Sequence, residues 1–463
     1  MAVSIEELTT VSDQAEATER LNTTSNGDRS AMLPRKLDAV TIPAASELGN
    51  TQIPELKHLY SSEVVATIWK VALKKLDDFE PPTSFPEYTR PDGTTYIESP
   101  ADFWTSGFFP GSLYLLLERQ RKWPQAFSNG NQKKGQPHPL KLEYACRWWT
   151  ERLHIQATAT NTHDLGFLIQ PWAQLGFELD SAENCLKSLI TAAYSLASRF
   201  DSKVGCIRSW DTCYTKRYKY DDPSKDFLVI IDNMMNLDIL YYVSKLNGDP
   251  RLEYIATSHA VATISAHIRD DDSTFHVVNF DQTTGQVKER FTNQGYSHDS
   301  CWSRGQAWGI AGFAQAYGWT KDERFLATSK RLADYFIAHL PDDFVPYWDF
   351  SAPLPGPRDT SAAMVAAYGL ILLYEAESNS TRYLDAALRI IEAVIKKYCS
   401  ANAIETEDLG IEMAETNDHE TILLNATINN YEHAPKRYAD HGLVYADYYF
   451  LLVGNKLLKM GLM

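Results

Sequence analysis

Apolar residues recur along most of the chain with the period of an α-helix, and the periodic segments end at Gly, Pro, Asn or Asp. The pattern predicts twelve helices. They are expected at residues 58–76, 110–122, 138–153, 164–176, 182–199, 232–246, 251–268, 303–317, 322–339, 360–377, 381–398 and 442–459.

Two kinds of helix alternate in this series. Residues 251–268 and 322–339 are apolar on one face and charged on the other, which predicts an outer position. Residues 305–314 and 361–374 are apolar or small on nearly every side, which predicts full burial. The alternation favours six antiparallel helix hairpins with an inner ring, an all-α (α/α)6 barrel. An open α-solenoid is the competing arrangement, but its usual repeat of roughly 30 to 45 residues is missing from this sequence.

The segments outside the helices are of two kinds. Residues 204–220 and 274–291 are expected to form short β-hairpin excursions, the second turning at Thr284-Gly285. Residues 1–50 contain no Phe, Tyr or Trp and predict a poorly ordered N-terminal arm. Residues 51–463 are then a single barrel domain.

Composition and charge restrict the kinds of molecule that the protein is expected to bind. The 463 residues are 44% apolar and 12% aromatic, enough for a large core. With 44 basic and 60 acidic residues, the net charge of −16 argues against nucleic acid as a partner. No stretch approaches the roughly 20 apolar residues that span a bilayer, so no membrane association is expected. Six scattered cysteines without a C-x-x-C pair, and an acidic start, predict reduced thiols and a cytoplasmic location. No oligomeric state follows from these features.

Polar and aromatic residues are concentrated where every second helix of the predicted series begins, from the second helix to the twelfth. In an antiparallel ring these helices run in one direction, so their N-termini open onto one mouth of the barrel. Their free N–H groups and dipoles would favour an anionic small molecule there. The segments concerned are Asp102–Gly111, Asn161–Gly166, Asp232–Asn236, Gln294–Arg304, Arg358–Ser361 and Asp440–Gly442.

Four aspartates in these segments are candidates for chemistry. Asp164, Asp232, Asp359 and Asp440 all lie where an N-cap belongs, and capping alone would explain an aspartate there. Asp232 differs, because it follows the apolar run 227–231 and precedes two methionines, which predicts a desolvated carboxyl group. Burial and a second carboxylate raise the pKa of such a group, while a helix N-terminus lowers it. If the first two effects prevail, Asp232 can act as a general acid near neutral pH.

The aromatic residues of the same segments have two interpretations. Trp104, Trp302 and Trp308 can belong to the core, or they can stack on the apolar face of a sugar ring. Trp302 and Arg304 flank Ser303, and we expect only one of the two to point into the core. Arg304 is the natural partner of a barrel carboxylate or of a substrate oxygen.

Other kinds of site lack support. The histidines 163, 276, 298 and 441 have no metal-ligand spacing and are expected to be hydrogen-bonded loop or core residues, although His276 lies on a hairpin that can lean over the cavity. No glycine-rich nucleotide motif and no G-x-S-x-G motif is present.

Four motifs together resemble a known family. Residues 60–460 are similar to the unsaturated glucuronyl hydrolases of glycoside hydrolase family 88. The similarity rests on Trp104-Thr-Ser-Gly-Phe108, His163-Asp164-Leu-Gly-Phe167, Asp232-Asn-Met-Met-Asn-Leu237 and Trp302-Ser-Arg-Gly-Gln-Ala-Trp-Gly309.

The resemblance implies an (α/α)6 barrel that removes a 4-deoxy-4,5-unsaturated uronic acid from the non-reducing end of oligosaccharides left by polysaccharide lyases. In that family the C4=C5 vinyl ether is hydrated, without a cofactor or a metal. By resemblance, Asp232 would donate a proton to C4 and then take one from the water that adds at C5. Asp164 would be the second carboxylate, which raises the pKa of Asp232 or holds the sugar hydroxyls.

The resemblance also implies a set of substrate-binding residues. Trp104 and Trp308 would stack on the sugar, and His276, Gln294, Trp302 and Arg304 would approach it. The sugar that follows the uronic acid is left open. Three alternatives also remain: an unsaturated rhamnogalacturonyl hydrolase, a non-catalytic sugar-binding barrel, and an ordinary retaining or inverting glycosidase.

Overall fold

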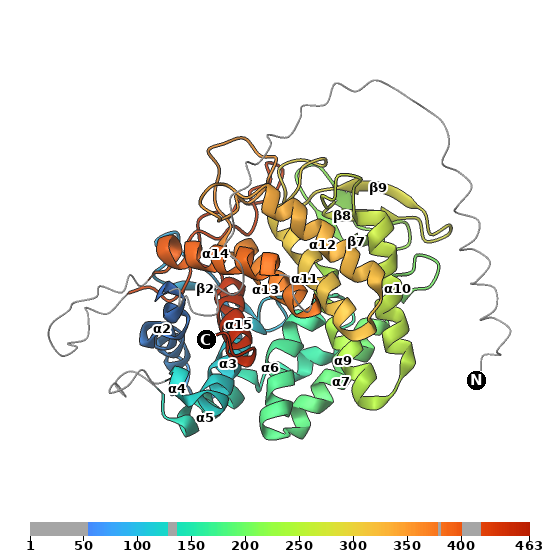
Figure 1. Ribbon diagram of the computed structural model, residues 1–463. Helices are drawn as coiled ribbons and strands as arrows, with labels where there is room; N and C mark the ends of the chain where they lie inside the picture. The colour runs from blue at the N-terminus through green and yellow to red at the C-terminus, as the bar shows by residue number, and fades with distance from the viewer. Residues whose placement is uncertain (1–53, 128–136, 378–380, 401–417) are drawn as a thin grey trace. The chain divides into compact units, whose positions relative to one another are not determined.

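The computed structural model describes residues 54–127, 137–377, 381–400 and 418–463, which all belong to the compact unit of residues 49–463 (Figure 1). The arm expected at residues 1–50 lies outside these ranges. The described chain is mainly helical. Within it, no helix combines the length and the apolar composition needed to cross a membrane.

All twelve segments predicted to be helical contain a helix. Their bounds are α2 (Ser62–Leu73), α3 (Phe108–Lys122), α5 (Pro139–Thr150), α6 (Leu165–Asp180), α7 (Glu183–Ala197), α9 (Asp238–Asn247), α10 (Pro250–His267), α11 (Ser303–Thr320), α12 (Glu323–Ala338), α13 (Thr360–Ala376), α14 (Thr381–Tyr398) and α15 (Val444–Lys459). The short α8 (Asn233–Asn236) precedes α9, so the segment expected at 232–246 is two helices. The short elements η3 (Pro54–Tyr60), α4 (Pro124–Phe127) and η4 (His154–Thr158) were not predicted.

The two predicted kinds of helix are present. Every residue of 305–314 in α11 is buried, and α13 is buried along most of its length. Helix α3 packs against α6, α6 against α8, α8 against α11, α11 against α13, α13 against α15, and α15 against α3. Helices α5, α7, α10, α12 and α14 each pack against one of these helices or against α9 (Figure 1). Among them, α12 buries one apolar face and exposes a charged one, as expected.

Glycines set the close spacing of the inner helices. A Cβ atom at Gly312 of α11 would lie 2.5 Å from the Cβ of Met234 in α8. At Gly369 of α13, a Cβ would lie 2.9 Å from the backbone nitrogen of Ala311. Because real Cβ atoms do not approach other heavy atoms so closely, the small residues noted in the sequence are what let these helices pack backbone to backbone.

The β-structure differs in part from the prediction. The hairpin expected at 274–291 is confirmed as β8 (Val277–Phe280) and β9 (Val287–Phe291), with Gly285 at φ 72° in its turn. The excursion expected at 204–220 is instead two short ladders, β3 (Phe200–Asp201) with β4 (Cys206–Ile207), and β5 (Cys213–Tyr214) with β6 (Lys219–Tyr220).

Two further strands were not predicted. β1 (Ser84–Thr89) pairs with β2 (Tyr96–Pro100), and β7 (Phe227–Ile230) pairs antiparallel with β8. The apolar run before Asp232 is therefore a fully buried strand of a three-stranded sheet. This strand delivers Asp232 to the interior.

Gly312→Ala should destabilise the fold by about 1–3 kcal/mol, because the added methyl group must displace Met234 and its backbone. Gly318→Ala is the matched control in the same helix. Gly318 is exposed with open space around its Cα, so alanine there should stabilise α11 by up to about 1 kcal/mol. Urea unfolding of both variants measures the difference, and equal effects would refute close helix spacing at Gly312.

Candidate active site

Asp232 lies between the end of β7 and the start of α8, with 9% of its surface exposed. Its side chain makes no capping hydrogen bond, and its Oδ2 has no partner among the described residues. Burial raises the pKa of Asp232 to about 7, although the positive charge of Arg304 opposes the shift. The negative charge of Asp164 raises the same pKa. The carboxyl group expected to be desolvated is therefore desolvated.

His276 faces Asp232 from the neighbouring strand, as the first residue before β8. Its Nδ1 accepts hydrogen bonds from the backbone N–H groups of Asn293 (3.1 Å) and Gln294 (3.3 Å). Burial holds the pKa of His276 well below its usual range, so the ring is neutral. With Nδ1 as acceptor, the proton is on Nε2, which lies 3.8 Å from Oδ2 of Asp232 and has no partner in the described chain. His276 is thus a hydrogen-bond donor toward the site.

Asp164 lies directly before α6, with 15% of its side chain exposed. Its Oδ2 accepts a hydrogen bond from the Thr162 hydroxyl at 2.8 Å, and its backbone N–H donates to the same hydroxyl at 3.1 Å. Its Oδ1 is 3.3 Å from Nε2 of the buried His163, whose pKa burial lowers. Asp164 is therefore held by its own loop and stays partly exposed to solvent.

The four aspartates differ in whether their side chains cap a helix. Asp359 caps α13 by accepting hydrogen bonds from the N–H groups of Ser361 and Ala362, as expected. Asp164 and Asp232 occupy cap positions without a capping bond. The cap expected at Asp440 is wrong, because α15 begins later, after Leu443. The backbone of Asp440 has a φ of 58°, and its side chain accepts a hydrogen bond from Asn425.

Arg304 connects the site to the last third of the chain. Its guanidinium group, 1% exposed, pairs with Asp359 at 2.7 Å and donates to the carbonyl oxygens of Thr427 and Ile428. It also lies over the Trp302 ring, 4.6 Å from the centroid. The expectation that only one of Trp302 and Arg304 points inward is wrong, since stacking lets the planar cation and the indole share one interior space.

Aromatic rings join the starts of four inner helices. The Trp104 centroid is 5.7 Å from that of Phe167 and 5.1 Å from that of Tyr445. Phe167 is in turn 5.2 Å from Trp308, which is fully buried. The predicted tryptophans before α3 and within α11 therefore belong to one cluster. Phe167 and Tyr445 were not singled out from the sequence, although both stand at the helix starts where chemistry was sought.

The remaining predicted residues, Trp302 and Gln294, both contact His276. Trp302 is 4.5 Å from His276, centroid to centroid. Gln294 donates through Nε2 to the carbonyl of Ile428 at 2.8 Å, which anchors its loop to the segment that also receives Arg304. His298 and His441 are hydrogen-bonded loop residues, as expected.

Several buried polar atoms of this site have no hydrogen-bond partner within the described ranges. They are Oδ2 of Asp232, Nε2 of His276, Nε1 of Trp302, Nε1 of Trp308 and the hydroxyl of Tyr445. Buried polar groups are usually paired, so these atoms are free to bond to a ligand that carries hydroxyl or carboxylate groups.

Asp447 resembles Asp232 in that burial raises its pKa to about 7, but it differs in its hydrogen bonds. Its oxygens accept hydrogen bonds from the Tyr96 hydroxyl and from the N–H groups of Ile422 and Leu423, at 2.9 Å each. Asp447 therefore anchors a loop, whereas Asp232 has an oxygen left for a reactant.

Buried acids, paired carboxylates and aromatic rings are the groups with which carbohydrate-active enzymes bind and process sugars. The sequence is 34% identical over 358 residues to an unsaturated glucuronyl hydrolase of Formosa agariphila, covering 76% of this chain and 79% of that protein. It is 30% identical over 355 residues to an unsaturated chondroitin disaccharide hydrolase of Streptococcus agalactiae, with 75% and 79% covered.

A solved structure, that of an unsaturated glucuronyl hydrolase specific for heparin, matches with a TM-score of 0.72 and 29% identity, covering 89% of this chain and 99% of that one. No family model matches the chain. The chain belongs to the unsaturated glucuronyl hydrolases, as the four motifs suggested. It is a glycosidase that acts on unsaturated uronic acids at the ends of lyase-generated oligosaccharides.

Asp232→Asn should stabilise the fold above pH 7. The native carboxyl keeps its proton up to about pH 7, whereas its unfolded counterpart loses it near 3.8, so the native state binds more protons between these values. Stability contributed by this group therefore falls as pH rises through that window. Melting curves from pH 4 to 8 should show the melting temperature of the variant rising relative to that of the wild type up to about pH 7. Above pH 7 the difference between the two melting temperatures should stay constant. No change in the difference with pH would contradict the buried acid.

Proposed function

We propose that the helix pairs close into the (α/α)6 barrel of a single catalytic domain, residues 51–463. The cyclic packing of α3, α6, α8, α11, α13 and α15 supports this closure, because the last helix returns to the first. The contacts among Trp104, Phe167, Trp308 and Tyr445 support a common mouth at their N-terminal ends.

In this proposal Asp232 is the general acid that protonates C4 of the unsaturated uronic acid. The observation that carries it is the buried, unpartnered Oδ2 on a carboxyl group whose pKa is about 7. Such a group is protonated in a large fraction of molecules at neutral pH, as a general acid must be. Around neutral pH, an aspartate in water would be ionised almost completely.

The steps balance without a cofactor. The C4–H bond forms as the alkene π electrons take the proton, which leaves an oxocarbenium-like cation at C5 and the ring oxygen. The Asp232 carboxylate, together with Asp164, stabilises that positive charge. Water then bonds to C5 and passes one proton to Asp232, which restores the acid. The resulting hemiketal opens to a ketone as the bond from C5 to the ring oxygen breaks, which leaves a hemiacetal at C1. The hemiacetal collapses to an aldehyde, its hydroxyl proton passes through water to the departing oxygen, and the remaining sugar leaves as an alcohol.

The surrounding residues bind and orient the sugar. The partly exposed Trp104 supplies a face for the ring, the buried Trp308 supports that face through Phe167, and Gln294 lines the approach. The Nε2–H of His276 and the indole N–H of Trp302 are unpartnered donors for hydroxyl or carboxylate oxygens. Arg304 contributes positive charge near the uronate carboxylate while its own donors hold Asp359 and the 427–428 carbonyls.

The proposed substrates are unsaturated disaccharides of glycosaminoglycan origin, in line with the names of two proteins similar to this chain. We also propose that the enzyme works in the cytoplasm. Its six cysteines are all buried and free, which suits a reducing compartment.

Asp232→Asn should lower kcat at least about a hundredfold, because an amide cannot donate a proton to C4. The loss of the alkene's ultraviolet absorbance on an unsaturated chondroitin disaccharide measures turnover, and circular dichroism checks the fold. Asp385→Asn is the matched control. Asp385 is another buried aspartate whose pKa burial raises, but it lies on the outer helix α14.

The control should keep wild-type turnover, and a saturated glucuronide should not be cleaved by the wild type. Unchanged turnover in Asp232→Asn, or cleavage of the saturated compound at a similar rate, would overturn the mechanism.

A further inference from the structure

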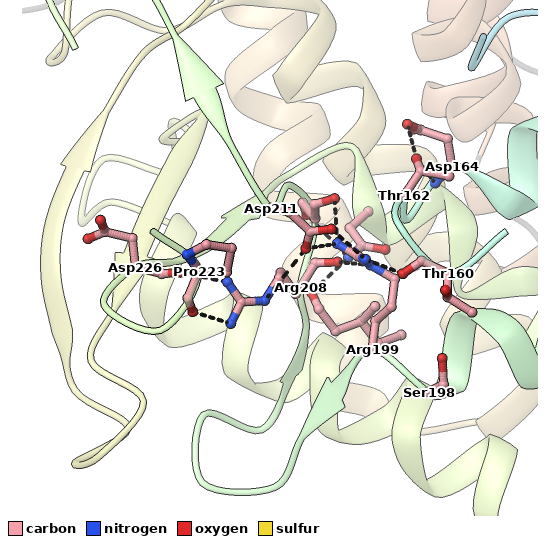
Figure 2. Close-up of polar contacts among 12 residues, drawn as sticks. Thr160, Thr162, Asp164, Ser198, Arg199, Arg208, Asp211, Pro223 and Asp226 are labelled. Atoms are coloured by element: carbon pink, nitrogen blue, oxygen red, sulfur yellow. Dashed lines mark hydrogen bonds and ion pairs between the residues drawn. The ribbon is translucent and has the colours of Figure 1, made fainter. Parts of the chain in front are cut away.

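Arg199 lies between α7 and β3 and directs its guanidinium group inward, with 5% of the side chain exposed (Figure 2). Its carboxylate partner is Asp211, with Nη2–Oδ1 at 2.9 Å and Nη1–Oδ2 at 3.4 Å. The other donors reach three backbone carbonyls, those of Thr160, Arg208 and Ser209. All five N–H donors of an arginine are thus used.

One side of this network leads to Asp164. The carbonyl of Thr160, bound by Arg199, belongs to the loop that enters α6, and two residues later Thr162 holds both the carboxylate and the N–H group of Asp164 (Figure 2). The position of the Asp164 carboxylate therefore depends on a loop that Arg199 holds through the Thr160 carbonyl.

The other side leads to Asp232. Arg199 binds the carbonyl of Ser209 at 3.3 Å, and the Ser209 hydroxyl accepts hydrogen bonds from the N–H of Ile230 at 3.0 Å and from the Asn233 amide at 3.3 Å. These two residues flank the segment that contains Asp232. The single side chain of Arg199 thus connects the loop of one carboxylate to the strand end of the other.

We propose that Arg199 is a positioning residue that sets the spacing between the Asp164 and Asp232 carboxylates. The inference rests on the roles proposed above for these two aspartates. Arg199 is placed to act on the geometry of the reaction and not on the substrate itself, because none of its donors is left over.

The fork of a guanidinium group is essential to this role. A lysine at position 199 has one nitrogen with three donors and cannot serve a carboxylate and three separate carbonyls at once. Backbone bridges from Trp210 to Thr162 and to Leu228 also join the two segments. Arg199→Lys should therefore leave the fold in place while loosening the carboxylate spacing.

Arg199→Lys should lower kcat about 10- to 100-fold and change KM less than about threefold, the pattern of a small misplacement of reacting groups. Arg119→Lys is the matched control. Arg119 is also buried and joins α3 to α15 through Asn455 and Leu451 and to η3 through Leu59, but it lies near the other end of α3 from Trp104. Its variant should lose comparable thermal stability and keep the wild-type kcat.

A double-mutant cycle with Asp164→Asn separates this role from general damage to the fold. If Arg199 acts through Asp164, adding Arg199→Lys to Asp164→Asn should cost less than about threefold further in kcat. Thr162→Val, which removes the hydroxyl that holds Asp164, should reproduce the kcat loss of Arg199→Lys.

Full additivity in the cycle, or equal kcat losses for the two arginine variants, would overturn the positioning role. Wild-type kcat in Arg199→Lys would do the same, and if that variant fails to fold, Thr162→Val and the Asp211→Asn variant decide by the same criteria. Wild-type activity of Asp164→Asn alone would instead refute the role proposed for Asp164, which distinguishes the two failures.

Discussion

The proposed mechanism depends on the free energy of holding one carboxyl group, that of Asp232, away from water. Strand β7 is buried at each of its four positions and ends two residues before Asp232, so the backbone carries the side chain into an apolar interior. Met234 and Met235, which follow Asp232 in α8, are buried as well. Ionisation there is disfavoured by burial and by the second carboxylate, and favoured by the charge of Arg304. The balance leaves the pKa of Asp232 near 7, a value at which the group can both donate and regain a proton at neutral pH.

The rest of the site maintains that balance. The antiparallel pairing of β7 with β8 continues to His276, whose carbonyl accepts from the N–H of Ile231, and this brings its neutral ring within 3.8 Å of Asp232. The loop after β9 fixes that ring through two backbone N–H groups. Asp359 and the carbonyls of residues 427–428 hold the charge of Arg304 close to the acid. Segments far apart in the sequence are thus required to tune a single pKa, which explains why the site is built where helix starts meet. These local donors also suit an anionic sugar on a chain whose net charge is −16.

Much of the helical fold could be predicted from the sequence, because helical periodicity and small-residue faces are local signals. Gly312 and Gly369 illustrate this, since the lack of a side chain is itself what brings the helices together. The break at Leu237 and the short strands were harder, because strand pairing such as that of β7 with β8 joins residues about 50 positions apart. Capping at Asp359 follows a local rule, whereas Asp440 failed because the chain bends there before α15 begins. The expectation that only one of Trp302 and Arg304 points into the core failed because the stacking between their side chains is a tertiary contact, which local sequence does not encode.

The protonation state of Asp232 in the free enzyme is the quantity on which this account depends. Carbon-13 labelling of aspartate carboxyl groups, with Asp232→Asn to assign the resonance, lets its titration be followed directly by NMR. The account predicts a midpoint near pH 7, about three units above that of an aspartate in water. A midpoint near 4 would show that the group is ionised at neutral pH, and protonation of the sugar carbon by Asp232 would then be ruled out as the basis of catalysis.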